Sequence, residues 1–124
     1  MRPKSKTVTD QELEIMKVVW RLQPATVRDV YEALLKERKI AYTSVMTMMK
    51  IMADKEHLRR RLDRRTYVYE ATRPKNQIIK ELVADFLNRV FSGSAEPLLL
   101  HLVRNRYVSE KDLNAIVRMT KERA

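Results

Sequence analysis

Residues Ala41–Ala71 read AYTSVMTMMKIMADKEHLRRRLDRRTYVYEA, and this stretch decides the fold. Its first part carries apolar residues at the three- and four-residue spacing of a helix. We expect that helix to begin at Tyr42 or Thr43 and to last to about Lys55. Two runs of strand-forming residues follow, and the chain between them is short enough for a hairpin. The stretch therefore predicts a helix and then two strands, Leu58–Leu62 and Thr66–Ala71.

The connection between the two strands is Asp63-Arg64-Arg65, which contains no glycine. Turns this tight usually need positive φ, and glycine adopts it at the least steric cost. Of these three residues, aspartate is the type that tolerates such a conformation most readily. A hairpin is therefore plausible, and the turn type stays open.

The predicted helix has one apolar stripe and one polar face. The stripe consists of Val45, Met48, Met49 and Met52. Thr43, Thr47, Lys50 and Asp54 lie opposite, flanked by Ser44 and Ile51. Methionines can bind a soft metal, but this spacing favours core packing. Short hydroxyl side chains let a helix approach base edges closely and hydrogen-bond to them. A solvated face is the alternative, and Asp54 would repel phosphate at the helix end.

The hairpin is strongly basic, with five arginines in the seven residues Arg59–Arg65. Guanidinium groups there would pair with DNA phosphates, although a charge run alone can be a solvated face. Strand alternation places Arg59 and Arg61 on one side, and Arg60 on the other with the neighbouring leucines. We expect the strongest contacts from Arg64 and Arg65 at the tip. The predicted DNA contacts are Tyr42, Thr43, Ser44, Thr47, Lys50, Arg59, Arg61, Arg64 and Arg65.

Two capped helices precede this stretch. Thr9-Asp10-Gln11-Glu12 is a capping box that opens a helix over Asp10–Leu22. Gln23-Pro24-Ala25 breaks it, and Thr26 caps a second helix with Asp29 at the third position. A polar turn over 36–40 leads into the helix described above. Three helices and a basic hairpin in this order predict a winged helix-turn-helix domain over residues 1–72.

The segment after the hairpin, residues 73–124, predicts helices only. Pro74 suits a first helical turn, and Gly93, the single glycine, ends that helix after Phe91. Glu96-Pro97 opens a short apolar helix, and Ser109 caps the last one, in which we expect Leu113, Ile116 and Val117 to face inward. A homodimer would bury this apolar surface, and a compact monomeric cap is the alternative. The predicted dimer contacts are Ile79, Leu82, Phe86, Val90, Leu98, Leu99, Leu102, Leu113, Ile116 and Val117.

The composition favours a polyanionic partner. The formal net charge is +10, and such a field attracts nucleic acid or an anionic membrane surface. No apolar run is long enough to span a membrane, and Met1–Thr7 leads into no signal-peptide core, so we expect a cytoplasmic protein without membrane insertion. The chain has no cysteine and two histidines, His57 and His101. We expect no metal, no cofactor and no enzymatic activity, because no phosphate loop or catalytic triad is evident.

The same residues closely resemble the bacterial penicillinase-repressor (BlaI/MecI-like) family. The likeness is carried by TDQELEIM at 9–16 with Val19-Trp20, ATVRDV at 25–30 and AYTSVMTMM at 41–49. It continues through TYVY at 66–69 and FSGS at 91–94 to Ser109-Glu110, and so covers nearly the whole chain. The order and spacing of these segments together are highly specific.

The resemblance implies a homodimeric repressor that binds a palindromic double-stranded operator, with Ser44 and Thr47 near the bases. It also implies a proteolytic switch at His101 and Leu102, cut by a membrane-bound sensor protease that responds to β-lactams. This sequence has Glu56 where relatives commonly carry a glycine, and it lacks the cysteines of the copper-responsive relatives. The alternative function is a winged-helix module that binds an acidic protein instead of DNA.

Overall fold

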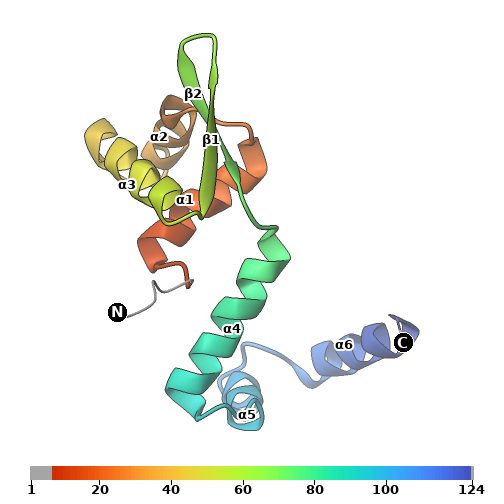
Figure 1. The fold of residues 1–124 in the computed structure, drawn as a ribbon. Helices are drawn as coiled ribbons and strands as arrows, with labels where there is room; N and C mark the ends of the chain where they lie inside the picture. The colour runs from red at the N-terminus through yellow and green to blue at the C-terminus, as the bar shows by residue number, and fades with distance from the viewer. Residues whose placement is uncertain (1–6, 124) are drawn as a thin grey trace, which may run out of the picture. The chain divides into compact units, whose positions relative to one another are not determined.

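The structure of the protein, a computed structural model, describes residues 7–123 (Figure 1). The expectation that the basic N-terminus is not part of a signal peptide concerns mainly residues 1–6, which lie outside the described residues. The described chain folds into six helices and one two-stranded antiparallel sheet. The elements are α1 Asp10–Leu22, α2 Val27–Leu35, α3 Tyr42–Asp54, β1 Leu58–Asp63, β2 Thr66–Ala71, α4 Lys75–Phe91, α5 Glu96–Arg104 and α6 Glu110–Arg123. The predicted fold class, mainly helical with a small hairpin, is confirmed.

The chain divides into two compact units between Leu82 and Val83, within α4. This division lies further along the chain than the expected boundary after Thr72. The first turns of α4 belong to the first unit because Ile78 is buried in its core. The Trp20 indole Nε1 also donates a hydrogen bond to the Arg73 carbonyl at 3.1 Å, just before α4 begins.

The core of the first unit is formed by one face from each helix and the base of the hairpin. Helix α3 contributes Val45, Met49 and Met52, all fully buried, so the methionine stripe is core as expected. The other fully buried large side chains are Ile15, Met16, Val19, Val30, Leu34 and Ile78. Close packing of these branched and flexible side chains fixes the position of α3 against α1 and α2.

Both predicted N-terminal capping boxes are present. In α1 the Glu12 amide donates to Thr9 Oγ1, and the Thr9 amide donates to Glu12 Oε1. Thr26 and Asp29 make the same exchange at the start of α2. Glu12 has a further role, because its buried carboxylate accepts a hydrogen bond from Lys55 Nζ at 3.0 Å. That contact joins the first turn of α1 to the end of α3.

Helix α3 ends in a Schellman motif with glutamate at the left-handed position. The Glu56 amide donates to the Ala53 carbonyl, and the His57 amide donates to the Met52 carbonyl at 2.9 Å. Glu56 has φ 68°, a conformation in which the Cβ of an L-residue is crowded. The chain therefore takes the same path that glycine would allow, and it carries a conformational cost at this residue.

The hairpin is longer and its turn tighter than the sequence suggested. Asp63 belongs to β1 and pairs with Thr66, which leaves Arg64 and Arg65 as the turn. Their φ angles are 48° and 73°, so both are left-handed, as a type I′ turn requires. The positive φ angles thus fall on the two arginines and not on Asp63, the residue type that tolerates this conformation most readily. The register is set at the base of the hairpin, where Leu58 and Tyr69 are buried, and a one-residue slip would expose both.

A short bridge attaches the hairpin to the connection between α1 and α2. The Ala25 amide donates to the Tyr69 carbonyl at 3.0 Å, and the Tyr69 amide donates to the Ala25 carbonyl at 2.7 Å. The Gln23 side chain accepts a hydrogen bond from the Ala71 amide nearby. The base of the hairpin is thereby held beside the helices, while its tip extends beyond them (Figure 1).

The second unit consists of the remainder of α4 with α5 and α6. Gly93, with φ 85°, follows α4 as expected. At the start of α6 the Ser109 amide donates to Asp112 Oδ2, and the Asp112 amide donates to Ser109 Oγ. Ile116 and Val117 are 47% and 49% exposed, and Leu113 is half-buried. The expectation that these residues face inward is therefore wrong for the single chain, because this small unit contains no fully buried side chain among its described residues that could form a core around them.

Candidate DNA-binding surface

The polar face of α3 borders a groove of about 1060 Å³ in the first unit. Within this groove Thr47, Lys50 and Ile51 come from α3, and Arg60, Tyr67 and Tyr69 come from the hairpin. The start of α2 closes one end with Val27 and Arg28. The full lining is Thr26, Val27, Arg28, Tyr42, Met46, Thr47, Lys50, Ile51, Asp54, Arg60, Arg65, Thr66, Tyr67 and Tyr69. A helix face and a hairpin thus form one continuous surface, lined by four basic residues and one acidic residue among mostly uncharged ones.

The predicted contacts on α3 divide between the two flanks of the helix. Tyr42 and Lys50 lie in the groove beside the hairpin. Thr43 and Ser44 line a second hollow of about 640 Å³ with Arg38 and Lys39. Thr47 borders both hollows, so it stands at the crest of the exposed face. Ala41 provides no side-chain cap for α3, and the first amides of the helix are therefore suited to a phosphate oxygen.

Arg60, which was not among the predicted contacts, is the best-positioned arginine within the groove. Its guanidinium carbon lies 4.5 Å from the centre of the Tyr67 ring, close enough for a cation–π interaction. A side-chain hydrogen bond with Tyr69 raises the pKa of Arg60, and the nearby Asp54 carboxylate acts in the same direction. Arg60 is therefore held in place by two aromatic residues before any ligand binds.

Arg59 and Arg61 lie on the opposite face of the hairpin, where both approach Glu70. The distances are 3.6 Å from Arg59 Nη2 and 3.9 Å from Arg61 Nε to the carboxylate oxygens. The predicted alternation along the strand is correct, but the face that borders the groove is the one with Arg60. The reason is that Arg60 lies on the same face of β1 as Leu58. This face packs on the core at the base of the hairpin and continues outward, past the core, along the groove.

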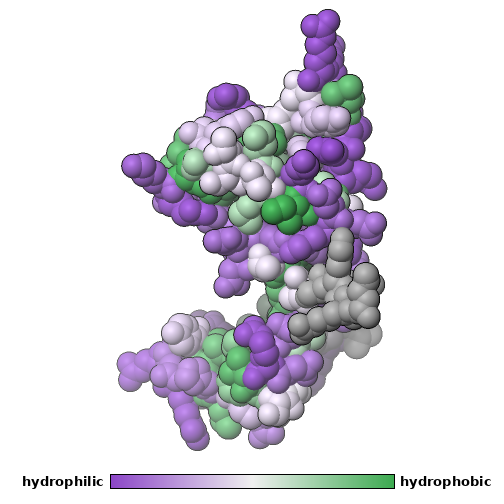
Figure 2. Space-filling model, turned by 60° about the vertical axis from the view of Figure 1, so that its left-hand side comes forward, coloured by the Kyte–Doolittle hydropathy of each residue, from purple (hydrophilic) through white to green (hydrophobic). Residues whose placement is uncertain are grey.

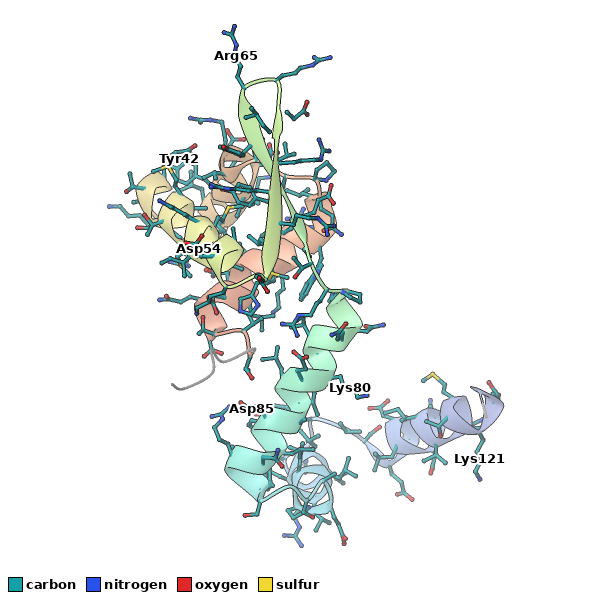
Figure 3. All side chains as sticks on the ribbon, in the orientation of Figure 1. Tyr42, Asp54, Arg65, Lys80, Asp85 and Lys121 are labelled. Carbon is teal, nitrogen blue, oxygen red and sulfur yellow. The ribbon has the colours of Figure 1, made fainter. Side chains whose placement is uncertain are left out.

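The turn carries Arg64 and Arg65, both exposed, at the far end of the hairpin. Figure 3 shows Arg65 at the tip, pointing away from the helices, and Arg65 also lines the groove. At the other end of the groove Arg28 lies 5.4 Å from the Tyr42 ring centre, and Tyr42 packs edge-on against Tyr31. Basic side chains therefore stand at both ends of the α3 face.

Two buried ionisable groups, Glu12 and His57, lie at the C-terminal end of α3. Burial raises the pKa of the Glu12 carboxyl, but hydrogen bonds from Thr9 and Lys55 outweigh burial and hold it below its ordinary value. Burial lowers the pKa of His57, whose Nε2 has no hydrogen-bond partner among the described residues. His57 follows α3 directly, and its neutral imidazole is part of the packing that connects α3 to β1.

Comparison with known proteins identifies the family. The sequence profile of the penicillinase repressors matches residues 8–122. The chain belongs to the penicillinase repressor family. The family resemblance noted in the sequence is thus confirmed.

Several curated members of the penicillinase repressor family are similar to this chain. "Transcriptional regulator BlaI" of Mycobacterium tuberculosis (strain CDC 1551 / Oshkosh) is 34% identical over 105 residues, which cover 83% of this chain and 76% of the relative. "Penicillinase repressor" of Bacillus licheniformis is 25% identical over 93% of this chain and 90% of its own. "Methicillin resistance regulatory protein MecI" of Mammaliicoccus sciuri is 20% identical over 94% of each.

Residues 7–123 contain neither a candidate metal site nor a candidate membrane-spanning helix. Within the part of the chain that the structure describes, no three histidine, aspartate or glutamate side chains gather closely enough to hold a metal ion. Over residues 7–123, no helix combines the length and the apolar character needed to cross a bilayer.

Proposed function

We propose that this member of the penicillinase repressor family is a transcriptional repressor that binds a two-fold symmetric operator as a homodimer. In this proposal α3 enters the major groove and the hairpin lies along the adjacent backbone. The observation that carries it is the groove in which Thr47 and Lys50 of α3 face Arg60 and Arg65 of the hairpin. A helix with short polar side chains can contact base edges, and the basic hairpin beside it can contact phosphates at the same time.

The homodimer is supported by the exposed apolar side chains of the second unit. Val90 is 52% exposed and Leu99 is 49% exposed, and Figure 2 shows hydrophobic side chains at the surface of this unit. Apolar exposure on this scale marks an association surface. The predicted dimer contacts Phe86, Ile116 and Val117 of this unit are likewise 39% to 49% exposed, and Ile79, which belongs to the first unit, is 41% exposed. Two copies of the same surface would form an isologous interface and provide the symmetry of the operator.

Enrichment of a random duplex library with the purified protein tests the proposal. We expect an inverted repeat whose half-sites are centred about 10 base pairs apart, or a multiple of that distance. Thr47→Ala should weaken binding to the enriched duplex and leave binding to a scrambled duplex unchanged. An equal loss on both duplexes would contradict base contact by Thr47. Binding to an acidic protein with no enrichment of any duplex would favour the protein-interaction module instead.

The dimer has a separate test in solution. Val90→Asp and Leu99→Asp together should convert a dimeric protein into a monomer in sedimentation experiments. Asp at two other exposed positions, Lys80 and Lys121, serves as the control, because Figure 3 shows both side chains at the surface of their helices. A wild-type protein that sediments as a monomer at tens of micromolar would refute the dimer.

Release of the operator by a membrane-bound sensor protease is the mechanism that the family resemblance implies. The relevant bond, His101–Leu102, lies inside α5, so cleavage requires that this helix unwind. Mass spectrometry of the protein from cells exposed to a β-lactam should then detect a fragment that ends at His101. We further propose that the protein controls genes of the antibiotic response and that it acts in the cytoplasm, beside the chromosome.

A further inference from the structure

Two large apolar side chains on α3 are exposed to solvent and are not part of the core of the first unit. Met46 is 45% exposed and Ile51 is 44% exposed, whereas Val45, Met49 and Met52 of the same helix are fully buried. Both side chains line the groove beside Thr47 and Lys50. Exposed apolar groups that share a groove with polar ones mark a surface that another molecule covers.

The charge around these side chains indicates which kind of molecule covers them. Lys50, Arg60 and Arg65 line the same groove, and Asp54 is its only acidic lining residue among those described. A polyanion complements this field, and the formal net charge of +10 adds to it. The major groove of DNA offers one prominent apolar group, the C5 methyl of thymine. A duplex with thymines in the half-site therefore matches both the apolar and the basic parts of the surface.

We propose that Met46 and Ile51 contact thymine methyl groups and, with Thr47, determine which operator is bound. This inference rests on the proposed function, because it concerns the same helix in the same groove. It assigns specificity to two apolar residues that the polar pattern of α3 did not single out.

The geometry of the helix limits where the thymines lie. Ile51 follows Thr47 by one turn, and Lys50 follows Met46 by one turn, so each apolar side chain adjoins a polar one. Met46 and Ile51 are separated by roughly 7.5 Å along the axis, at ~1.5 Å per residue. They also lie about 140° apart around the axis, at ~100° per residue, and so flank the Thr47 face on opposite sides. The two side chains should therefore contact two different thymines within each half-site.

The test removes one methyl group at a time from the DNA. The probe is the duplex enriched from the random library, with each thymine replaced in turn by 2′-deoxyuridine. This change deletes the C5 methyl and keeps the hydrogen-bonding edge of the base. We expect about a fourfold loss of affinity at each contacted position, the effect of exposing one methylene-sized group.

The protein variants assign each loss to a side chain. Met46→Gln and Ile51→Gln replace each apolar side chain with a polar one on an exposed face of α3, so the fold is retained and circular dichroism verifies it. Each variant should abolish the uridine effect at one position and keep it at the other. Leu35→Gln is the matched control, because Leu35 is 42% exposed on α2 and does not line the groove. This control should show the same uridine pattern as the wild-type protein.

The outcomes separate this inference from the proposed function. If the enriched duplex binds tightly and no uridine position weakens it, the inference is overturned and the proposed function stands. Uridine effects that persist in both variants would assign the methyl contacts to another residue, such as Thr47, and would also overturn the inference. If no duplex is enriched, the proposed function itself fails.

Discussion

Two pairs of arginines on the hairpin differ in position but not in charge, and this difference allows a sharp prediction. Arg60 and Arg65 line the groove beside α3, whereas Arg59 and Arg61 lie on the other face beside Glu70. Replacing either pair with alanine removes the same two charges from the chain. Any effect of net charge on DNA binding is therefore equal for the two double variants, and only the position of the arginines differs.

The expected magnitude follows from counterion release. Each phosphate that a basic side chain neutralises contributes about 0.9 to the slope of log affinity against log salt. The variant Arg60→Ala with Arg65→Ala should thus reduce the slope by about 1.8 for each bound subunit. Between about 50 mM and about 200 mM salt, the wild-type protein then loses about 12-fold more affinity than this variant for each bound subunit. The variant Arg59→Ala with Arg61→Ala should change the slope by less than about half of that amount, because Glu70 already neutralises part of the charge of Arg59 and Arg61.

Fluorescence anisotropy on a labelled duplex, repeated over a series of salt concentrations, measures both slopes. A scrambled duplex is sufficient, since phosphate contacts do not depend on sequence. Thermal unfolding of each variant verifies that the hairpin remains folded, which matters because Arg60 contacts Tyr67 and Tyr69. Equal slope changes for the two pairs, or a larger change for Arg59 and Arg61, would refute the assignment of the Arg60 face to DNA.

Three further predictions concern stability, measured by urea denaturation at a fixed protein concentration. Glu56→Gly should raise the free energy of unfolding by about 1 kcal/mol, since glycine relieves the crowding at φ 68°, whereas Glu56→Ala keeps the Cβ and should not. Glu12→Ala should lower it by about 2 kcal/mol, because the buried Lys55 contact and the capping box are lost together, and Asp29→Ala in the exposed box of α2 should cost less. The pKa of His57 is lower in the folded protein than in the unfolded chain, and the charged groups near it are Glu12, Lys55, Arg73 and Glu81. Its contribution to the free energy of unfolding is therefore complete above about pH 6.5 and declines as the pH falls below that value. His57→Gln should flatten the decline between about pH 6.5 and about pH 5, a range above the titration of Glu12, and an unchanged decline would exclude His57 as its origin.

The sequence predicted the elements of the fold well because their signals are local. The capping boxes at Thr9 and Thr26 placed two helix starts, and the i, i+3, i+4, i+7 methionine spacing identified the buried face of α3. The polar face of α3 and the basic hairpin were evident from the same patterns. The side of the strand that carries Arg60 was also predicted correctly from alternation.

Two local details were not predictable from residue preferences. Arginine rarely adopts positive φ, and yet both turn residues do so, because the burial of Leu58 and Tyr69 fixes the register of the strands. Glu56 takes a left-handed conformation for a similar reason, since its neighbours Met52 and His57 are both buried. In each case the packing of adjacent residues outweighs about 1 to 2 kcal/mol of local backbone preference.

By itself, the sequence determined the order of the helices and strands, the apolar and polar faces of each, and the family. Only the tertiary structure decided which side of the hairpin borders α3. Alternation assigns residues to two faces but cannot say which face continues from the core into the groove. That choice depends on the burial of Leu58 and Tyr69 at the base of the hairpin, which the bridge between Ala25 and Tyr69 holds beside the helices. It brought Arg60, Met46 and Ile51 into one groove with Thr47, because packing and not sequence spacing determines which surfaces of two elements meet.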